Sequence, residues 1–290
     1  MPPKKHDVKD ILLNILRFIL IGSKKKKVEL PPHLRKSWIR EYFESAVITV
    51  IMALFGMTFV VQAVKVPTGS MLNTILIGDH LLVNKFIFGM DGLGLSQILP
   101  QRPIRRGDII VFKYPKDPNT NYVKRVIGLP GETIEIKGHK VFINGNELPE
   151  NRFAAEVHLG AQSLPDTNAP LDVTSVETTP QATYNVYYSS QTLSSEEDEE
   201  EPLLSGQLYG VKEPFKIPQG HYFVMGDNRE NSQDSRYWGS VPRENVVGRA
   251  LFVYWSLDTS RDENGNNSSG NFIVDFITRT RWKRMGTLIR

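Results

Sequence analysis

The pattern of hydrophobic and polar positions divides the chain into an apolar N-terminal segment and a longer part with short alternating runs. Residues 46–64, AVITVIMALFGMTFVVQAV, carry no charge. At about 1.5 Å per residue, a helix of this length nearly spans the roughly 30 Å hydrocarbon core of a bilayer. We therefore expect a transmembrane signal-anchor helix over 46–64. A buried core helix is one alternative, although few soluble helices are apolar on every face. A cleaved signal peptide is another, with an unusually long basic region before it.

The residues before this segment are basic. The Lys and Arg excess over residues 1–45 predicts a cytoplasmic N-terminal region, with residues 65–290 outside the cytoplasm. A second apolar run, ILLNILRFILI at 11–21, is short and contains Arg17. We expect an interfacial helix there, followed by the Lys24–Lys27 cluster near anionic lipid. A second membrane span is the alternative.

Short strand-like runs replace the helical pattern after residue 65. These runs are HLLVNKFIF, GDIIVFKYP, YVKRVIGLPGETIEI, KVFINGNEL, HYFVMGDN and VVGRALFVYWSL. The Asn144-Gly145 pair predicts a type I′ hairpin turn within 137–148. Helical periodicity is scarce, so we expect a mainly β catalytic domain over 65–290 with a smaller β subdomain.

The stretch at about 151–210 is rich in Thr, Ser, Pro and acidic residues, and it contains SSEEDEEE at 194–201. Such a composition buries little apolar surface. We expect a flexible acidic insertion with no catalytic part, attached to the smaller β subdomain.

Composition excludes several function classes. The chain has no cysteine, which excludes disulfides, a thiol nucleophile and cysteine-ligated metals. The net charge is only +3 and no basic stripe carries interleaved aromatic residues, so we expect no nucleic-acid binding. The six histidines are scattered, and GDNRENSQDSR lacks the ligand order of a calcium loop. No metal or organic cofactor is expected.

A serine nucleophile needs a base to take its proton. Ser70, in PTGSMLN, is the candidate nucleophile. His80 and His221 are possible bases, but ordinary strand positions describe both better. Lys124, in YVKRVIGLP, shares an apolar face with Val126 if the strand alternates, which puts Arg125 in solvent. A lysine becomes a base when desolvation lowers its pKa from about 10.4, and a snorkelling lysine is the alternative.

Four blocks resemble, in order, the bacterial type I signal peptidase (leader peptidase) family of serine proteases with a Ser-Lys dyad. They are PTGSMLNTILIGDHLLVNKF, RRGDIIVFKYP, YVKRVIGLPGE and GDNRENSQDSRYWGSVPRENVVGRA. The blocks cover just under a quarter of the chain. The resemblance implies a catalytic domain of coiled antiparallel β-sheets at the bacterial inner membrane, on its extracytoplasmic side.

The resemblance also implies roles for individual residues. Ser70 is the nucleophile and Lys124 the general base. Thr68 joins the Ser70 N–H in the oxyanion hole, and Ser232 orients Lys124. The supporting ion pair is Asp234 with Arg236. The expected walls of the substrate cleft are Val64, Val66, Met71, Tyr122 and Val123.

Glycines and turn residues complete the implied site. Gly69 lets the chain turn at Ser70, Asp227 and Asn228 shape a second turn, and Gly226 allows close backbone approach. One position departs from the family pattern, because Asn73 replaces a proline that commonly follows the nucleophile. A lysine base, in place of histidine, argues against the endomembrane type of the family.

The function implied is removal of signal peptides from exported preproteins by a membrane-anchored serine endopeptidase. The expected partners are signal peptides, the lipid bilayer and the secretion translocon. Two alternatives stay open: a peptidase of the same family with a single substrate, and an inactive membrane-tethered β binding module. Four aromatic residues are candidates for either the membrane interface or the core: Phe86, Phe88, Trp238 and Trp255.

Overall fold

The computed structural model describes residues 38–56, 61–89, 101–156, 171–190, 193, 206–258 and 272–290. The chain forms two compact units, Met1–Ala53 and Leu54–Arg290. The helix expected at 11–21 and the acidic run 194–201 lie outside the described residues.

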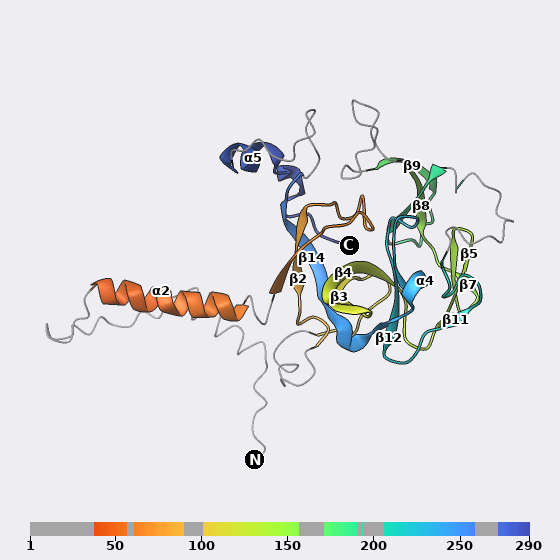
Figure 1. The fold of residues 1–290 in the computed structure, drawn as a ribbon, viewed down its shortest axis with the longest axis horizontal. Helices are drawn as coiled ribbons and strands as arrows, with labels where there is room; N and C mark the ends of the chain where they lie inside the picture. Colours follow the sequence, from red (N-terminus) through yellow and green to blue (C-terminus); the bar gives the residue numbers. More distant parts are fainter. Residues whose placement is uncertain are drawn as a thin grey trace, which may run out of the picture. The chain divides into compact units, whose positions relative to one another are not determined.

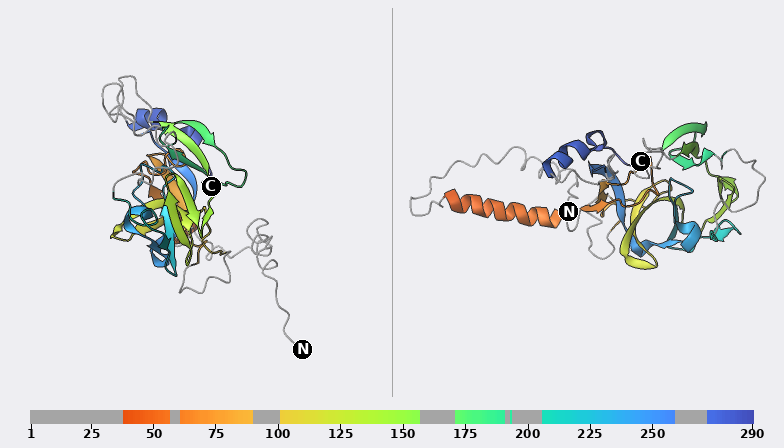
Figure 2. Two further views of the ribbon diagram at one scale, coloured as in Figure 1. Left: turned by 90° about the vertical axis from the view of Figure 1, so that its right-hand side faces the viewer. Right: turned by 45° about the horizontal axis from the view of Figure 1, so that its top comes forward.

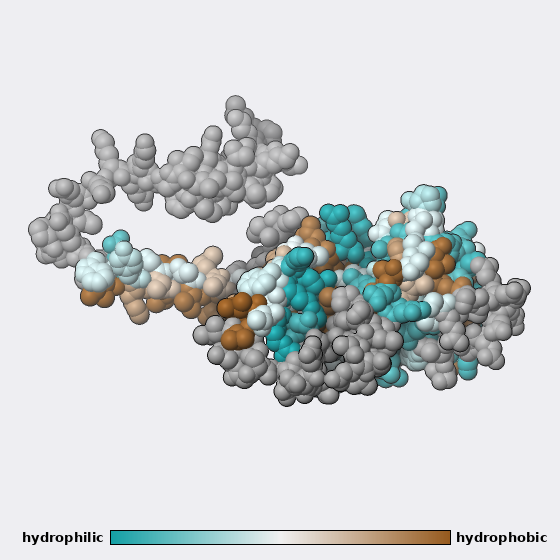
Figure 3. All heavy atoms as spheres, turned by 90° about the horizontal axis from the view of Figure 1, so that it is seen from above, coloured by the Kyte–Doolittle hydropathy of each residue, from teal (hydrophilic) through white to brown (hydrophobic). Residues whose placement is uncertain are grey.

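Helix α2 runs over Trp38–Phe55, so it begins before the apolar segment expected to be helical. Its first turns contain its charged residues, and Arg40 pairs with Glu44 at 2.9 Å. Hydrophobic residues lie along it (Figure 3). Residues 61–64, predicted as the end of that helix, instead belong to strand β1, because they pair with β2 and one side of the strand packs on the core. Within the described ranges, no helix is long and apolar enough to cross a membrane.

A seven-stranded sheet, antiparallel between all neighbours, forms the body of the second unit. Its long strands are strongly curved (Figures 1 and 2). In spatial order the strands are β1 (Val61–Lys65), β2 (Asp79–Asn84), β14 (Val246–Ser256), β3 (Ile109–Tyr114), β4 (Asp117–Gly128), β12 (His221–Met225) and β13 (Val241–Pro242). The predicted mainly β domain is therefore confirmed.

A four-stranded antiparallel sheet lies beyond β12 (Figure 1). Its strands are β11 (Phe215–Lys216), β5 (Thr133–Lys137), β6 (Lys140–Ile143) and β7 (Asn146–Glu147). Asn144 and Gly145 join β6 to β7 with φ of 51° and 81°. Two positive φ values define a type I′ turn, so the predicted hairpin is confirmed.

A three-stranded sheet contains β10 (Asn185–Tyr188), β8 (Asn151–Glu156) and β9 (Asp172–Glu177) in that order. The prediction of a flexible insertion over 151–210 is wrong for these strands. The polar composition of this stretch reflects β9, which is exposed throughout. It did not reveal that Val186 and Tyr188 of β10 pack into a core cluster. Strands β10 and β8 are parallel, so the sheets are not all antiparallel as expected.

Short helical turns complete the fold: α4 (Ser235–Trp238), η4 (Arg243–Asn245), α5 (Phe272–Arg279) and η5 (Trp282–Arg284). Phe86, Phe88 and Trp238 are buried, so an interfacial position for them is wrong. Trp255 is half-buried and stacks on His80. Strand β4 lies between β3 and β12, and Val123–Gly128 is buried on both faces. This central strand carries Lys124 into the interior.

Candidate active site

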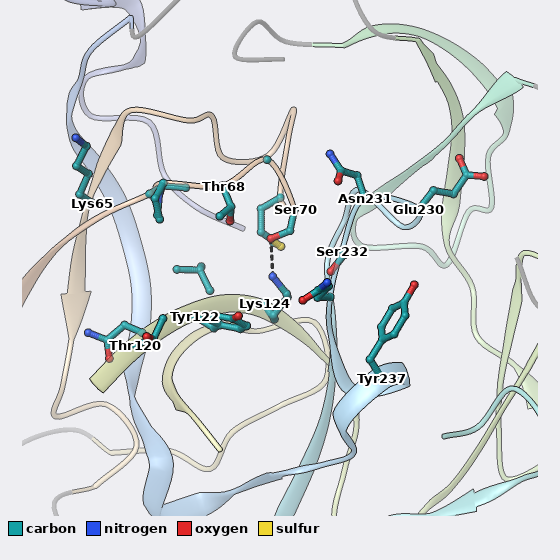
Figure 4. Close-up of a pocket in the computed structure, with 17 residues that line it drawn as sticks. Lys65, Thr68, Ser70, Thr120, Tyr122, Lys124, Glu230, Asn231, Ser232 and Tyr237 are labelled. Carbon is teal, nitrogen blue, oxygen red and sulfur yellow. Dashed lines mark hydrogen bonds between the residues drawn. The ribbon is translucent and has the colours of Figure 1, made fainter. Parts of the chain in front are cut away.

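Ser70 and Lys124 meet although 54 positions separate them in the chain. Ser70 lies in the turn between β1 and β2, and Lys124 lies in β4. Lys124 Nζ is 2.5 Å from Ser70 Oγ, the contact drawn in Figure 4. Their exposed fractions are 4% for Lys124 and 7% for Ser70. The two reactive groups are in hydrogen-bonding contact and nearly out of water.

Burial sets the protonation of Lys124. The loss of hydration lowers its pKa from the usual 10.5 to about 8. Asp234 and Asp227 oppose this shift by attracting the ammonium, while Arg236 repels it. Val126, on the same face, is fully buried, so the predicted position of Lys124 on a core-facing side of the strand is confirmed. A neutral Lys124 is therefore accessible near neutral pH and could accept a proton.

Arg125 is buried, and its predicted position in solvent is wrong. Its side chain is 2% exposed and donates two hydrogen bonds, of 2.7 and 2.6 Å, to the Asp227 carboxylate. It also donates to Gly107 O at 2.8 Å and stacks over Tyr184, 4.4 Å from the ring centroid. Strand alternation did not put Arg125 in solvent because other parts of the protein cover both faces of β4 at this point.

The segment after β12 holds the Ser70 turn in place. Asn228 N donates to Ser70 O and Asn228 Nδ2 donates to Gly69 O, each at 3.1 Å. Thr74 Oγ1 donates to Asp227 Oδ2 at 2.6 Å. These bonds fix the turn on both sides of Ser70, a role for Asp227 and Asn228 beyond the predicted one of shaping their own turn.

Gly226 permits this close approach. A Cβ at Gly226 would lie 2.4 Å from both Ser70 O and Ser232 Oγ, so no larger residue fits. Gly69 was expected to let the chain turn at Ser70, but its φ is not positive, so the turn does not use the conformational freedom of glycine there. Asn73 takes that conformation instead, with φ of 70°.

Asp234 and Arg236 form the predicted ion pair, with two bonds of 2.8 Å and both side chains almost fully buried. Burial alone would raise the pKa of Asp234, but Arg236 and the hydrogen bonds outweigh it and hold that pKa below its usual range. Asp234 also accepts from Gly226 N at 3.1 Å. Ser232 Oγ is buried and makes no hydrogen bond to Lys124, so that predicted bond is not formed, although Ser232 is close enough to Asp234 to help lower its pKa.

A cleft of about 590 Å³ opens above the Ser70–Lys124 pair. Of the predicted wall residues, Val66, Met71, Tyr122 and Val123 line it, as does Thr68. Val64 does not; it packs against the core. His80 and His221 are also absent from the lining. The sequence did not single out several polar lining residues. Five of them are labelled in Figure 4: Lys65, Thr120, Glu230, Asn231 and Tyr237. The other two are Asn121 and Gln233.

A fully buried pair behind the cleft also escaped sequence reasoning. Arg229 donates to both carboxylate oxygens of Glu150, and neither side chain is exposed. Arg236 donates to Arg229 O, which links this pair to Asp234. Glu150 lies in the connection between β7 and β8, and no pattern in that stretch marks it as buried.

Comparisons with known proteins agree closely with one another. A family model described as signal peptidase, peptidase S26, matches residues 39–255. Signal peptidase I of Pseudomonas fluorescens is 36% identical over 229 residues, which cover 74% of this chain and 72% of that protein. Signal peptidase I of Aquifex aeolicus is 34% identical over 239 residues, which cover 75% of this chain and 85% of that protein. A crystal structure of a signal peptidase I from Enterococcus faecalis is 27% identical over 51% of this chain and 97% of its own. Its TM-score of 0.28 is too low for a comparison of folds.

Proposed function

The chain belongs to the signal peptidase family, peptidase S26, and we propose that it removes signal peptides from exported preproteins with Ser70 as nucleophile and Lys124 as general base. The resemblance of the four sequence blocks is thereby confirmed, and membership makes the protein a serine endopeptidase. One observation carries the assignment of residues: a buried lysine with a lowered pKa contacts a serine hydroxyl in the wall of a cleft.

Acylation follows from this contact. Ser70 Oγ attacks the scissile carbonyl carbon as its proton passes to neutral Lys124 Nζ. The carbonyl electron pair moves to oxygen, and the Ser70 N–H and the Thr68 hydroxyl are the proposed donors to that oxyanion. The tetrahedral intermediate then expels the amine of the mature protein, which takes the proton from Lys124. The signal peptide is left as an ester on Ser70.

Deacylation reuses the same base. Lys124, neutral again, takes a proton from a water molecule as the water oxygen attacks the ester carbonyl. Collapse of the second tetrahedral intermediate breaks the ester bond and returns the proton to Ser70 Oγ. Because Lys124 must start each step neutral, both steps accelerate as the pH rises through its pKa of about 8.

The cleft walls support a preference for small residues at the cleavage site. Val66, Met71 and Val123 are almost fully buried and present a fixed apolar surface beside Ser70. Shallow apolar walls accept alanine more readily than large side chains. We therefore expect cleavage after Ala-x-Ala sequences.

We further propose the lipid bilayer as a partner, with the chain tethered through its N-terminal apolar segment and the second unit outside the cytoplasm of a bacterium. Exposed hydrophobic side chains near the C-terminus support contact with the membrane. This C-terminal surface comprises Val274, Phe276, Ile277, Trp282, Met285 and Leu288. Phe276 packs edge-on against Trp282 at 5.9 Å, and Arg279 and Lys283 lie among these residues in sequence. Apolar and basic side chains together favour an anionic membrane surface. The translocon is inferred as a partner from the substrate alone.

Tryptophan quenching tests the membrane contact. The full chain is reconstituted in vesicles that contain brominated, anionic lipid. The Trp282→Ala variant should lose a large share of the wild-type quenching, whereas Trp238→Phe, at a buried position, should not. Equal quenching in wild type and Trp282→Ala would show that this C-terminal surface does not contact the membrane.

Cleavage of a preprotein with an Ala-x-Ala site by the detergent-solubilised full chain tests the function. We expect cleavage by wild type and none by Ser70→Ala or Lys124→Met. No cleavage by folded wild type across several preproteins would contradict general signal-peptide processing. Cleavage of one preprotein in a broad panel would instead identify a peptidase with a single substrate.

A further inference from the structure

The turn that carries Ser70 contains an unusual backbone conformation. In this nucleophile turn, residues 69–75, Asn73 has a φ of 70°. Among the described residues, Asn144 is the other non-glycine residue with a positive φ, and a hairpin turn requires it there. Asn73 is the third residue of a turn closed by Thr74 N, which donates to Met71 O at 3.1 Å, and asparagine and glycine are the residues that tolerate a positive φ at that position. A proline could not adopt this conformation, because its ring holds φ near −65°.

The Asn73 side chain bonds to a segment far away in sequence. Its Nδ2 donates to Leu171 O at 3.2 Å, and Leu171 N donates to Asn73 Oδ1 at 2.8 Å. The amide therefore pairs with both backbone groups of one residue, as a neighbouring strand would. Leu171 directly precedes β9, so these bonds attach the nucleophile turn to the outer strand of the three-stranded sheet.

The opposite outer strand of that sheet reaches the site by a second route. Tyr187 of β10 accepts from Arg229 N at 3.0 Å, and Tyr187 N donates to Asp227 O at 2.8 Å. Asn228, between these residues, bonds to Ser70 O. The three-stranded sheet therefore closes a ring of backbone and amide hydrogen bonds that begins and ends at the nucleophile turn.

We propose that Asn73 is a positioning residue that holds the nucleophile turn against the three-stranded sheet and so keeps Ser70 Oγ within reach of Lys124. This inference rests on the proposed Ser-Lys mechanism. Asn73 contributes by position, because it is not among the residues that line the cleft. Proton transfer needs Oγ and Nζ at hydrogen-bond distance, and a displacement of about 1 Å can cost about a hundredfold in rate.

Three variants of the full chain separate the side-chain bonds from the backbone conformation. Asn73→Gly tolerates the positive φ but removes both bonds. Leu171→Pro removes the N–H that donates to Asn73 and leaves the turn itself unchanged. The matched control is Asn144→Gly, because Asn144 also has a positive φ and also accepts a backbone N–H, that of Thr133 at 2.9 Å, away from the cleft.

The assays are preprotein cleavage, hydrolysis of a small activated ester, and amide hydrogen exchange of peptides covering 66–76. We expect Asn73→Gly to lower kcat about tenfold, which corresponds to about 1.4 kcal/mol, with KM within about twofold of wild type. Exchange in the nucleophile turn should be faster in this variant. The control should keep wild-type kcat, and the Asn73→Gly, Leu171→Pro double variant should be no slower than the worse single variant.

Full kcat in a folded Asn73→Gly variant would overturn the proposal, and so would additive losses in the double variant or an equal loss in the control. Ester hydrolysis distinguishes this failure from failure of the proposed function. If wild type hydrolyses the ester but cleaves no preprotein, the substrate assignment fails, while a tenfold ester defect in Asn73→Gly still supports the positioning role.

Discussion

Replacing Lys124 by methionine should stabilise the protein at neutral pH, although it should abolish activity. Methionine has a similar length and no charge, so it fits the buried position beside Val126 without the cost of desolvating an ammonium group. The drop in the Lys124 pKa from 10.5 to about 8 corresponds to about 3 kcal/mol. The lost hydrogen bond to Ser70 offsets about 1 kcal/mol of this. We therefore expect a net gain of about 2 kcal/mol in the free energy of unfolding at pH 7.

The gain should depend on pH in a defined window. Between pH 8 and 10.5 the unfolded chain keeps its proton on Lys124 while the folded chain has released it, so the stability of the wild type rises with pH. Below pH 8 Lys124 is protonated in both the folded and the unfolded chain, so the folded state bears the full cost of desolvating the ammonium group. The advantage of Lys124→Met should therefore be constant below pH 8, pass through zero before pH 10.5, and leave the variant about 1 kcal/mol less stable than wild type above that pH, where only the lost hydrogen bond counts.

Urea unfolding of the full chain in detergent, followed by tryptophan fluorescence from pH 6 to 10, measures this difference. The control is Lys113→Met, at an exposed position of the neighbouring strand β3, whose difference from wild type should stay flat across the same range. A Lys124→Met advantage that stays constant up to pH 10, or a variant clearly less stable than wild type at pH 7, would contradict a desolvation cost at Lys124. Either result would mean that burial does not penalise the charged form.

Three further predictions concern the surroundings of the pair. The kcat/KM for preprotein cleavage should rise about tenfold per pH unit below pH 8 and level off above it; a profile flat from pH 6 to 9 would exclude Lys124 as the titrating base. Arg125→Met should lower the unfolding free energy by about 3–5 kcal/mol in urea titrations because it leaves Asp227 buried and unpaired. Lys137→Met, which breaks an exposed pair with Glu135, should cost less than about 1 kcal/mol; equal costs would contradict the burial argument. Gly226→Ala should reduce cleavage to background because its Cβ would meet Ser70 O, whereas Gly56→Ala, with no atom within 4 Å, should retain wild-type activity; an active Gly226→Ala variant would show that the turn can shift.

Local patterns in the sequence predicted the features that depend on neighbouring residues. The Asn144-Gly145 hairpin follows from two adjacent turn residues, and the buried face of Lys124 follows from strand alternation with Val126. Ser70 and Lys124 were candidates from their local surroundings, but their assignment as a catalytic pair came from the resemblance, since nothing local brings the two residues together. That contact depends on the order of strands in the large sheet.

Features set by tertiary packing were missed. Alternation places Arg125 on the face opposite Lys124 but does not show that Asp227 and Tyr184 cover that face. The absence of charged residues over 46–64 favours a membrane helix throughout. Residues 61–64 instead form strand β1, because their backbone hydrogen bonds pair with β2. The polar composition of 151–210 concealed a sheet whose few buried residues, Val186 and Tyr188 among them, join a core built by other segments.

The position of the acyl group in the acyl-enzyme identifies the nucleophile. The wild type is mixed with a preprotein, and the reaction is quenched in acid within the first turnover and digested for mass spectrometry. We predict that the signal peptide is attached as an ester within the segment between Lys65 and Lys85, at Ser70, and that Ser70→Ala carries no adduct. An adduct at Thr68 or Thr74, or cleavage by Ser70→Ala at the wild-type rate, would contradict the assignment of Ser70 as the nucleophile.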